Sequence, residues 1–281
     1  MASASAVVRR GMKVASAAAD RWRPSVAGVV ILLYHRVGGG SALEIDLDAA
    51  RFEEQIAAIA ESGRVVPLAI ALAQLAAVPG EQPADSSIVV SFDDGTADFA
   101  EIAVPILERH RVPATLYLAT GFVDGEVPVP CGGRPVSWSA LRDSVSTGLI
   151  DIGSHTHTHR LLDRISRTEA ADELDRSIDL IGERLGLPAL DFAYPKAVPG
   201  GHAVTELVRD RFRSAALAGT RVNPFRCDDP RRATDPQRLA RSPIQVSDGM
   251  DFFARKLAGG MGLEGAFRRA IDRVRYARLA T

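Results

Sequence analysis

The sequence predicts an α/β protein with a mostly parallel sheet, and it favours a closed or nearly closed barrel over an open sheet. Two observations support this prediction. Short apolar runs alternate with longer segments of helical periodicity along most of the chain, and strands that alternate with helices pair in parallel through right-handed crossovers. Because the chain holds many such strand–helix units, closure of the sheet into a barrel is the favoured arrangement.

Apolar runs and helical patterns place the individual elements along the chain. The expected strands are residues 29–34, 88–92, 114–118, 149–153, 192–194, 214–217 and 244–246. The expected helices are residues 48–62, 98–110, 137–146 and 166–185. The last helix carries signals at both ends, since Ser166 and Glu169 form a capping-box pattern and Gly186 is a typical helix stop.

We expect one main domain, residues 26–248, with an appendage at each end. The leader, residues 1–25, is rich in Ala, Ser and basic residues but lacks the apolar stretch of a secretory signal. It is therefore interpreted as a flexible or amphipathic segment. The tail, residues 249–281, has apolar residues at roughly helical spacing among many basic ones. Such a helix lies on an anionic membrane surface or packs on the barrel, and the sequence leaves both alternatives open.

Composition limits the partners and the location of the protein. The chain has 34 basic and 35 acidic residues among 281, so no nucleic-acid partner is expected. Cys131 and Cys227 match no zinc-binding spacing and are too few for a disulfide framework. Together with the missing export signal, they predict a cytoplasmic protein, which is membrane-peripheral if the tail lies on a membrane.

Two carboxylates, Asp93 and Asp94, directly follow an expected strand, and parallel α/β folds place their active sites at the carboxyl ends of strands. Adjacent carboxylates repel one another, and a bound cation would relieve that repulsion. Gly95 permits a tight turn behind them. Because Asp and Gly are also common turn residues, this motif alone leaves a structural role open.

Three histidines, His155, His157 and His159, follow the expected strand 149–153 within five residues. Neutral imidazole is a common zinc ligand, and two imidazoles with one carboxylate form a recurring metal-binding set. The histidine cluster therefore favours a metal site. A further strand end, Tyr194–Lys196, is placed to reach the same mouth.

These motifs together resemble the polysaccharide deacetylase family, the NodB-homology or carbohydrate esterase family 4 domain. The segments that carry the resemblance are 33–37, 91–95, 136–142, 155–159 and 192–195. They cover residues from about 30 to 246 in the family's order. The resemblance implies a distorted (β/α)7 barrel and an enzyme that removes N-acetyl groups from an acetamido sugar in a glycan or glycoconjugate.

The resemblance also implies roles for single residues. It makes Asp93 the general base, and it makes Asp94, His155 and His159 the ligands of a divalent metal, with His157 beside them. Zinc is the expected metal, although Co2+, Ni2+ and Mn2+ fit the same ligands. In such a site the cation lowers the pKa of a bound water and polarises the amide carbonyl, and the base accepts the water's proton.

The chain departs from the family pattern at two places. Ala193 stands where many members have an arginine that orients the catalytic aspartate, and residues 239–244 lack the histidine that often serves as general acid. His35 and His157 are the candidates for that proton donor. If the domain is degenerate, the alternative is a carbohydrate-binding protein without catalysis, and a further alternative is an enzyme acting on a non-sugar amide.

Four residues are candidate substrate contacts: Trp138, Tyr194, Pro195 and Lys196. Trp138 offers a flat apolar face to a sugar ring or packs into the core. Lys196, together with Arg241, is a candidate contact for an anionic group on the substrate, and solvated surface charge is the alternative.

Overall fold

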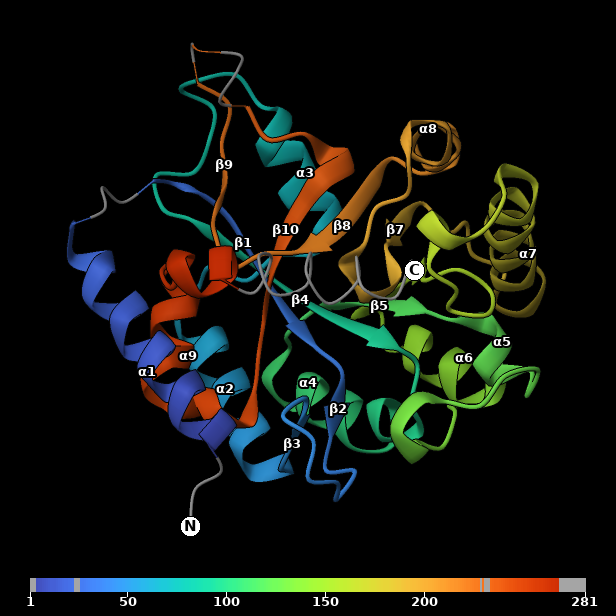
Figure 1. The fold of residues 1–281 in the computed structure, drawn as a ribbon, viewed down its shortest axis with the longest axis horizontal. Coiled ribbons are helices and arrows are strands. Elements are labelled where there is room, and N and C mark those ends of the chain that lie inside the picture. Colours follow the sequence, from blue (N-terminus) through green and yellow to red (C-terminus); the bar gives the residue numbers. More distant parts are fainter. Residues whose placement is uncertain (1–3, 23–25, 228, 230–232, 268–281) are drawn as a thin grey trace.

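Seven parallel strands form the closed barrel at the centre of the computed structural model, which describes residues 4–22, 26–227, 229 and 233–267. Around the barrel the order is β1, β4, β5, β6, β7, β8 and β10, and β10 pairs again with β1 (Figure 1). The short strand β9 (Asn223–Pro224) adds to β1 in the antiparallel direction. The predicted distorted (β/α)7 barrel is therefore confirmed.

The barrel strands agree closely with the apolar runs of the sequence. Their bounds are β1 Gly28–Tyr34, β4 Ser87–Asp94, β5 Ala114–Leu118, β6 Ile150–Ser154, β7 Asp191–Ala193, β8 Ser214–Ala218 and β10 Leu239–Pro243. A separate two-stranded sheet pairs β2 (Arg36–Val37) with β3 (Asp46–Leu47).

Helices cover the outside of the barrel. Their bounds are α1 Ala4–Ala19, α2 Ala49–Glu61, α3 Leu68–Ala76, α4 Val104–His110, α5 Thr120–Val123, α6 Trp138–Ser146, α7 Arg167–Leu185, α8 His202–Arg211 and α9 Gly249–Leu257. A π-helical segment, Phe99–Ala103, leads into α4. The capping box at Ser166 and the left-handed Gly186 after α7 are both present. Helices α3, α5 and α8 had no counterpart among the expected helices.

The prediction for the last strand was wrong, because β10 occupies Leu239–Pro243 and not residues 244–246. Its sequence, Leu-Ala-Arg-Ser-Pro, has no apolar run, yet all five residues are buried. The barrel interior accepts Arg241 because an opposite charge meets it there. A strand whose buried charge is paired across the barrel gives no apolar signal along the chain.

Alternation along the strands decides which side chains enter the barrel. On β1, Val30, Leu32 and Tyr34 belong to the large core beneath the helices, whereas Val29 and Ile31 belong to a second cluster with interior residues of the other strands. Leu68, Ala71 and Leu75 of α3 belong to this second cluster too. Successive side chains of a strand point to opposite faces, so an interior position recurs every second residue.

Both ends of the described chain pack onto the barrel side that carries α9. The described leader residues form helix α1, which corresponds to the amphipathic alternative, and α1 contacts α9. In the tail, α9 contacts α2 and β1, and Phe253 and Lys256 are buried. The predicted membrane contact through the tail therefore has no support up to residue 267, and residues 268–281 lie outside the described residues. Among the described residues, no helix is long and apolar enough to cross a membrane.

Candidate active site

The two carboxylates lie at the carboxyl end of β4, where the strand alternation breaks. Asp93 continues the interior series, whereas Asp94 adopts a left-handed conformation with φ 76°. Gly95 follows with φ 92°, and a Cβ there would lie 2.4 Å from Leu118 Cδ1. Only glycine fits this position without displacing Leu118. The tight turn at Gly95 therefore ends the strand and leaves both carboxylates at the barrel mouth.

Asp94, His155 and His159 form a group that fits a metal ion. One ligand atom from each residue lies within 4.8 Å of the others. His159 Nε2 is 3.4 Å and His155 Nε2 is 3.7 Å from Asp94 Oδ1. This donor set of one carboxylate and two imidazoles is common at zinc and related metals. The resemblance grouped these three residues, and the fold brings them together.

A backbone contact fixes which nitrogen of His155 is available. Its Nδ1 lies 2.7 Å from the carbonyl oxygen of Ala193 at the end of β7. A carbonyl only accepts, so Nδ1 carries the proton and donates it to Ala193. The lone pair of Nε2 then faces Asp94 and His159. Orientation of a ligating imidazole by such a contact is typical of metal sites.

The loop between the two histidines is strained and is held by α7. Thr156 has φ 65° and His159 has φ 60°, a region that residues other than glycine rarely occupy. Glu173 of α7 compensates, because its carboxylate accepts hydrogen bonds from the Thr158 amide, at 2.7 Å, and from the Thr158 hydroxyl. Its backbone carbonyl accepts from His157 N at 3.1 Å. Strain of this kind concentrates at functional sites.

Arg241 of β10 holds Asp93 from across the barrel. Its Nη1 and Nη2 donate to the two carboxylate oxygens of Asp93 at 2.5 and 2.9 Å, and its guanidinium lies 4.9 Å from the ring centroid of Tyr117. Both members of the pair are buried. The orienting arginine that the sequence comparison missed at Ala193 is therefore present, supplied by another strand. Because the last strand was predicted at residues 244–246, the sequence did not indicate that Arg241 lies inside the barrel.

These surroundings set the charge of each group. Burial alone would raise the pKa of Asp93, but Arg241 and His155 hold that pKa below its usual range. Burial lowers the pKa of His155 to about 4 and that of His159 to about 4. At neutral pH, Asp93 is thus an anion and both imidazoles are neutral, which is the form that binds a metal.

A cavity of about 310 Å³ opens above these groups. The residues that line it are Leu33, His35, Ile45, Asp93, Asp94, His155, His159, Lys196, Ala197, Ala218, Arg241 and Pro243. His35 Nδ1 is buried and has no hydrogen-bond partner among the described residues. Lys196 and Ala197 have positive φ of 52° and 56°. Both His35, which is half-buried, and Lys196, which is exposed, therefore contribute side chains to the wall of the cavity.

His157 lies away from the cavity. Its Nδ1 is 2.9 Å from Thr120 Oγ1, and its Nε2 is 2.8 Å from Glu126 Oε2. Both ring nitrogens are engaged under the loop, and His157 is not among the described residues that line the cavity. The geometry gives His157 a part in holding the loop and gives no basis for the proposed proton donation.

Three of the candidate substrate contacts also lie outside the described lining of this cavity. Trp138 begins α6, and its Nε1 donates to Asp124 Oδ1 at 2.7 Å. Tyr194 packs edge-on against Phe192 with centroids 5.0 Å apart, and burial raises its pKa to about 12. Pro195 is buried beside it. Apolar packing accounts for these three residues, and Lys196 alone of the four reaches the cavity.

Comparison with known proteins gives one matching family and a group of similar structures. The sequence model of the family described as polysaccharide deacetylase matches residues 80–213. The protein YxkH of Bacillus subtilis is 22% identical over 169 residues, which is 60% of this chain and 57% of YxkH. The chain thus aligns with little more than half the length of this curated relative.

Three solved structures share the fold over most of their length. The deacetylase PplD of Streptococcus pyogenes, in complex with acetate, has a TM-score of 0.67 and 18% identity, and the match covers 82% of this chain and 98% of PplD. IcaB of Ammonifex degensii has a TM-score of 0.66 and 22% identity over 82% and 97%. A de-N-acetylase of Aggregatibacter actinomycetemcomitans has a TM-score of 0.64 and 17% identity over 81% and 99%. At these identities, the likeness establishes the fold.

Proposed function

We propose that this chain, whose residues 80–213 match the polysaccharide deacetylase family, is a metal-dependent hydrolase that removes N-acetyl groups from an acetamido sugar of a glycan or glycoconjugate. The main support is one juxtaposition. The ligand set Asp94, His155 and His159 shares a cavity with Asp93, which Arg241 keeps ionised. A metal site beside an ionised carboxylate is the arrangement that amide hydrolysis by an activated water requires.

A divalent cation at the ligand set would polarise the amide carbonyl and make a water molecule more acidic. Asp93 is placed to accept the proton of that water, because its Oδ2 lies 3.8 Å from His155 Nε2 and so borders the ligand group. The two hydrogen bonds from Arg241 fix the carboxylate plane. Asp93 is therefore the general base of the proposal, with Arg241 as its positioning residue.

The departing amine needs a proton, and His35 is the proposed donor. It follows β1 at the barrel mouth and lines the cavity with Asp94 and His159. Its buried Nδ1 has no hydrogen-bond partner among the described residues, so no described group competes with a substrate for that nitrogen. Of the two candidates from the sequence, the geometry favours His35 over His157.

Zinc is the proposed metal, because two imidazoles and one carboxylate suit it and leave positions for water and substrate. Lys196 is the proposed contact for a polar or anionic substituent of the substrate, since it lines the cavity on the side of His159. Tyr194, Pro195 and Trp138 have no part in this proposal.

The first experiment measures the divalent metal content of the purified protein after loading with zinc, together with Asp94→Ala and His155→Ala. We expect near-stoichiometric metal in the wild type and at least a tenfold loss of affinity in both variants. His202→Ala is the matched control, since this histidine is 88% exposed at its side chain. Failure of the wild type to bind metal would exclude the proposed hydrolase.

Acetate release from N-acetylated oligosaccharides then tests the chemistry. Asp93→Asn should retain the metal and lose turnover by a factor of about 10³. If the wild type binds metal and sugar but releases no acetate, the protein is a carbohydrate-binding domain. If it cleaves only amides that carry no sugar, the proposed substrate class is wrong, but the proposed metal site and general base still hold.

A further inference from the structure

Helix α1 packs on the protein with its polar side inward. Among residues 8–19, whose burial the structure describes, Lys13, Ser16 and Ala17 are buried, and Lys13 is only 2% exposed. A surface helix normally buries its apolar side and exposes its charges. The reversed orientation of α1 therefore requires a structural cause, and the exposure of its apolar side requires an explanation.

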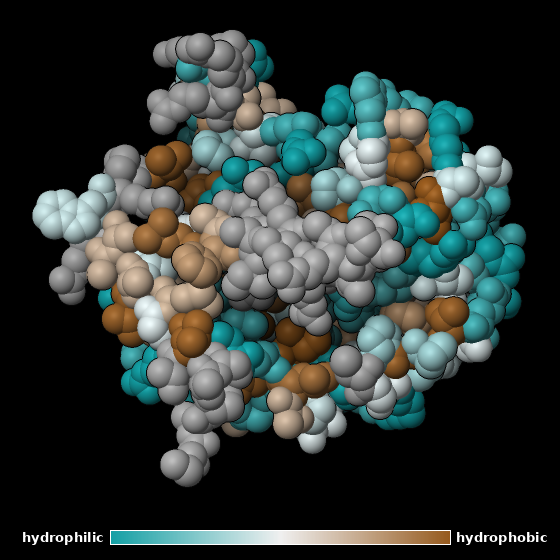
Figure 2. Space-filling view, in the orientation of Figure 1, coloured by the Kyte–Doolittle hydropathy of each residue, from teal (hydrophilic) through white to brown (hydrophobic). Residues whose placement is uncertain are grey.

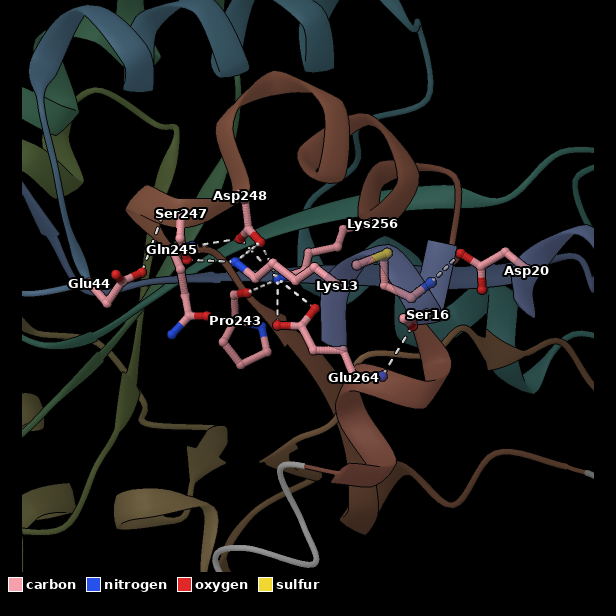
Figure 3. Close-up of polar contacts among 11 residues, drawn as sticks. Lys13, Ser16, Asp20, Glu44, Pro243, Gln245, Ser247, Asp248, Lys256 and Glu264 are labelled. Carbon is pink, nitrogen blue, oxygen red and sulfur yellow. Dashed lines mark hydrogen bonds and ion pairs between the residues drawn. The ribbon is translucent and has the colours of Figure 1, made fainter. Parts of the chain in front are cut away.

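The cause is a buried ionic cluster that α1 completes, made of Lys13, Asp248, Lys256 and Glu264 (Figure 3). Lys13 Nζ donates to Asp248 Oδ1 at 2.6 Å and to Ser247 Oγ at 2.7 Å. One turn further along, Ser16 Oγ accepts from the Glu264 amide at 3.1 Å. Rotating α1 to bury its apolar side would withdraw Lys13 from Asp248, at the cost of a buried carboxylate with one cation fewer.

The outward side of α1 is an uncharged stripe of Val8, Gly11, Val14, Ala15 and Ala18, all of them exposed. Val8 is 62% and Val14 is 55% exposed. Trp22, in the 3-10 turn that follows the helix, is 89% exposed. Apolar atoms gather along the surface where α1 lies (Figure 2). Trp is an amphipathic side chain that favours membrane–water boundaries.

The charged residues of α1 itself are all basic, although Glu44 pairs with Arg9 and Asp20 follows the helix. Residues 4–19 include no acidic residue, and the basic residues Arg9 and Arg10 flank the stripe. Arg10 is exposed, while Arg9 turns toward Glu44 at 3.6 Å. An apolar stripe beside basic residues is complementary to an anionic lipid surface. A second copy of the same surface would bring like charges together, which disfavours self-association.

The stripe lies close to the barrel mouth. Glu44, the partner of Arg9, precedes Ile45, which lines the site cavity. The Glu44 carboxylate accepts a hydrogen bond from Ser247 N at 3.2 Å, and the Ser247 hydroxyl in turn accepts one from Lys13 Nζ. An external surface that binds the exposed side of α1 would therefore lie near the entrance through which substrate reaches Asp93.

We propose that α1 and Trp22 form a membrane-docking surface for anionic lipids, and that the substrate is an N-acetylated glycoconjugate carried on a lipid. The docking depends only on the surface of α1. The substrate class rests in addition on the proposed hydrolase function. Because α1 has 16 residues and a buried polar side, it lies in the interfacial plane and does not span the bilayer.

The test is flotation of the full-length protein with vesicles of phosphatidylcholine alone and of phosphatidylcholine with phosphatidylglycerol. We expect binding to the anionic vesicles that declines with added salt, and at least about tenfold weaker binding for Val14→Glu and for Trp22→Ala. Ile70→Glu is the matched control, because Ile70 of α3 is 49% exposed on another surface and should bind like the wild type. Thermal unfolding and acetate release from a soluble substrate verify that each variant is folded.

The outcomes separate the two proposals. Absence of wild-type binding to anionic vesicles, or equal binding by Val14→Glu, overturns the docking surface even if soluble substrate is hydrolysed. A wild-type dimer that becomes monomeric in Val14→Glu, without vesicle binding, also overturns it, since a second copy then covers the stripe. Vesicle binding without any hydrolysis leaves the docking surface and removes the proposed function.

Discussion

Two groups of buried charges lie on the β10 side of this molecule, and they differ in what surrounds them. The Asp93–Arg241 pair, hereafter the mouth pair, borders a cavity and backbone segments with positive φ. It also lies near His35 Nδ1, a buried atom with no hydrogen-bond partner among the described residues. The ionic cluster of Lys13, Asp248, Lys256 and Glu264 is enclosed by α1, α9 and the chain that follows β10. Burial of charge is common to both, so burial by itself does not mark an active site.

The difference lies in redundancy and access. Within the part of the chain that the structure describes, Asp93 has one cation within hydrogen-bonding distance, Arg241, and it also lies near the His155 imidazole of the ligand group. Asp248 has two, since Lys13 and Lys256 both donate to it. A site that performs chemistry leaves groups open to a ligand, whereas a structural cluster closes each charge against another charge of the protein.

The largest expected effect follows from breaking the mouth pair. Arg241→Met leaves Asp93 buried without its cation, so we expect a loss of about 3–5 kcal/mol in the free energy of unfolding. Acetate release should fall about 100-fold because the base loses its orientation. Chemical denaturation and steady-state kinetics measure the two effects.

The control for Arg241 is a second bidentate pair on the barrel. Arg213 donates to both oxygens of Asp191 at 3.0 and 2.8 Å, but the arginine is partly exposed and lies outside the cavity. Arg213→Met should cost about 1 kcal/mol or less and leave acetate release unchanged. Equal losses in both variants would show that the mouth pair is merely structural.

A smaller effect is expected from the ionic cluster. Lys256→Met removes one of the two described cations that donate to Asp248 and also the contact from Lys256 to Glu264. Because Lys13 still donates to Asp248, we expect a loss of about 2–3 kcal/mol of unfolding free energy. Activity on a soluble substrate should remain within about twofold, because none of the cluster residues lines the site cavity. The neighbouring Arg255→Met, on the exposed side of α9, serves as the control and should be near neutral. A large loss of turnover in Lys256→Met would mean that the two charged groups are coupled.

The smallest expected effect is the dependence of stability on acid pH. Burial alone would raise the pKa of Asp248, but Lys256 and Lys13 hold that pKa below its ordinary value. The unfolded chain therefore binds a proton before the folded chain does, so stability present above about pH 4 is lost as the pH falls through the folded-state pKa.

The same Lys256→Met variant isolates this contribution. With one cation fewer, the pKa of Asp248 is depressed less, so the variant should lose about 1 kcal/mol less stability than the wild type between about pH 6 and about pH 3. Denaturant titrations at a series of pH values measure the difference. Glu264 loses its contact with Lys256 in the same variant, whereas the carboxyl groups away from Lys256 contribute alike in both proteins. If the unfolding free energies of the two proteins change in parallel with pH, the assignment of two cations to Asp248 is wrong.

The sequence, together with the family resemblance of its motifs, predicted the barrel and the ligand group. Apolar runs place six of the seven barrel strands, because parallel strands buried on both faces need continuous apolar residues. Asp94, His155 and His159 follow such runs directly, and in a parallel barrel the carboxyl ends of strands converge on one mouth. Local signals also placed the ends of α7, where capping depends on neighbouring residues only.

Tertiary structure alone decided the partner of Asp93, the placement of His157 and the orientation of α1. Arg241 and Asp93 are 148 residues apart, and closure of the barrel is what brings them together. His157 has ligand chemistry like its neighbours, but the positive φ of Thr156 and His159 turns the loop so that His157 meets Thr120 and Glu126. The inward face of α1 follows from Asp248, 235 residues from Lys13. Pairings between distant charges leave no periodicity along the chain, so only the folded arrangement shows them.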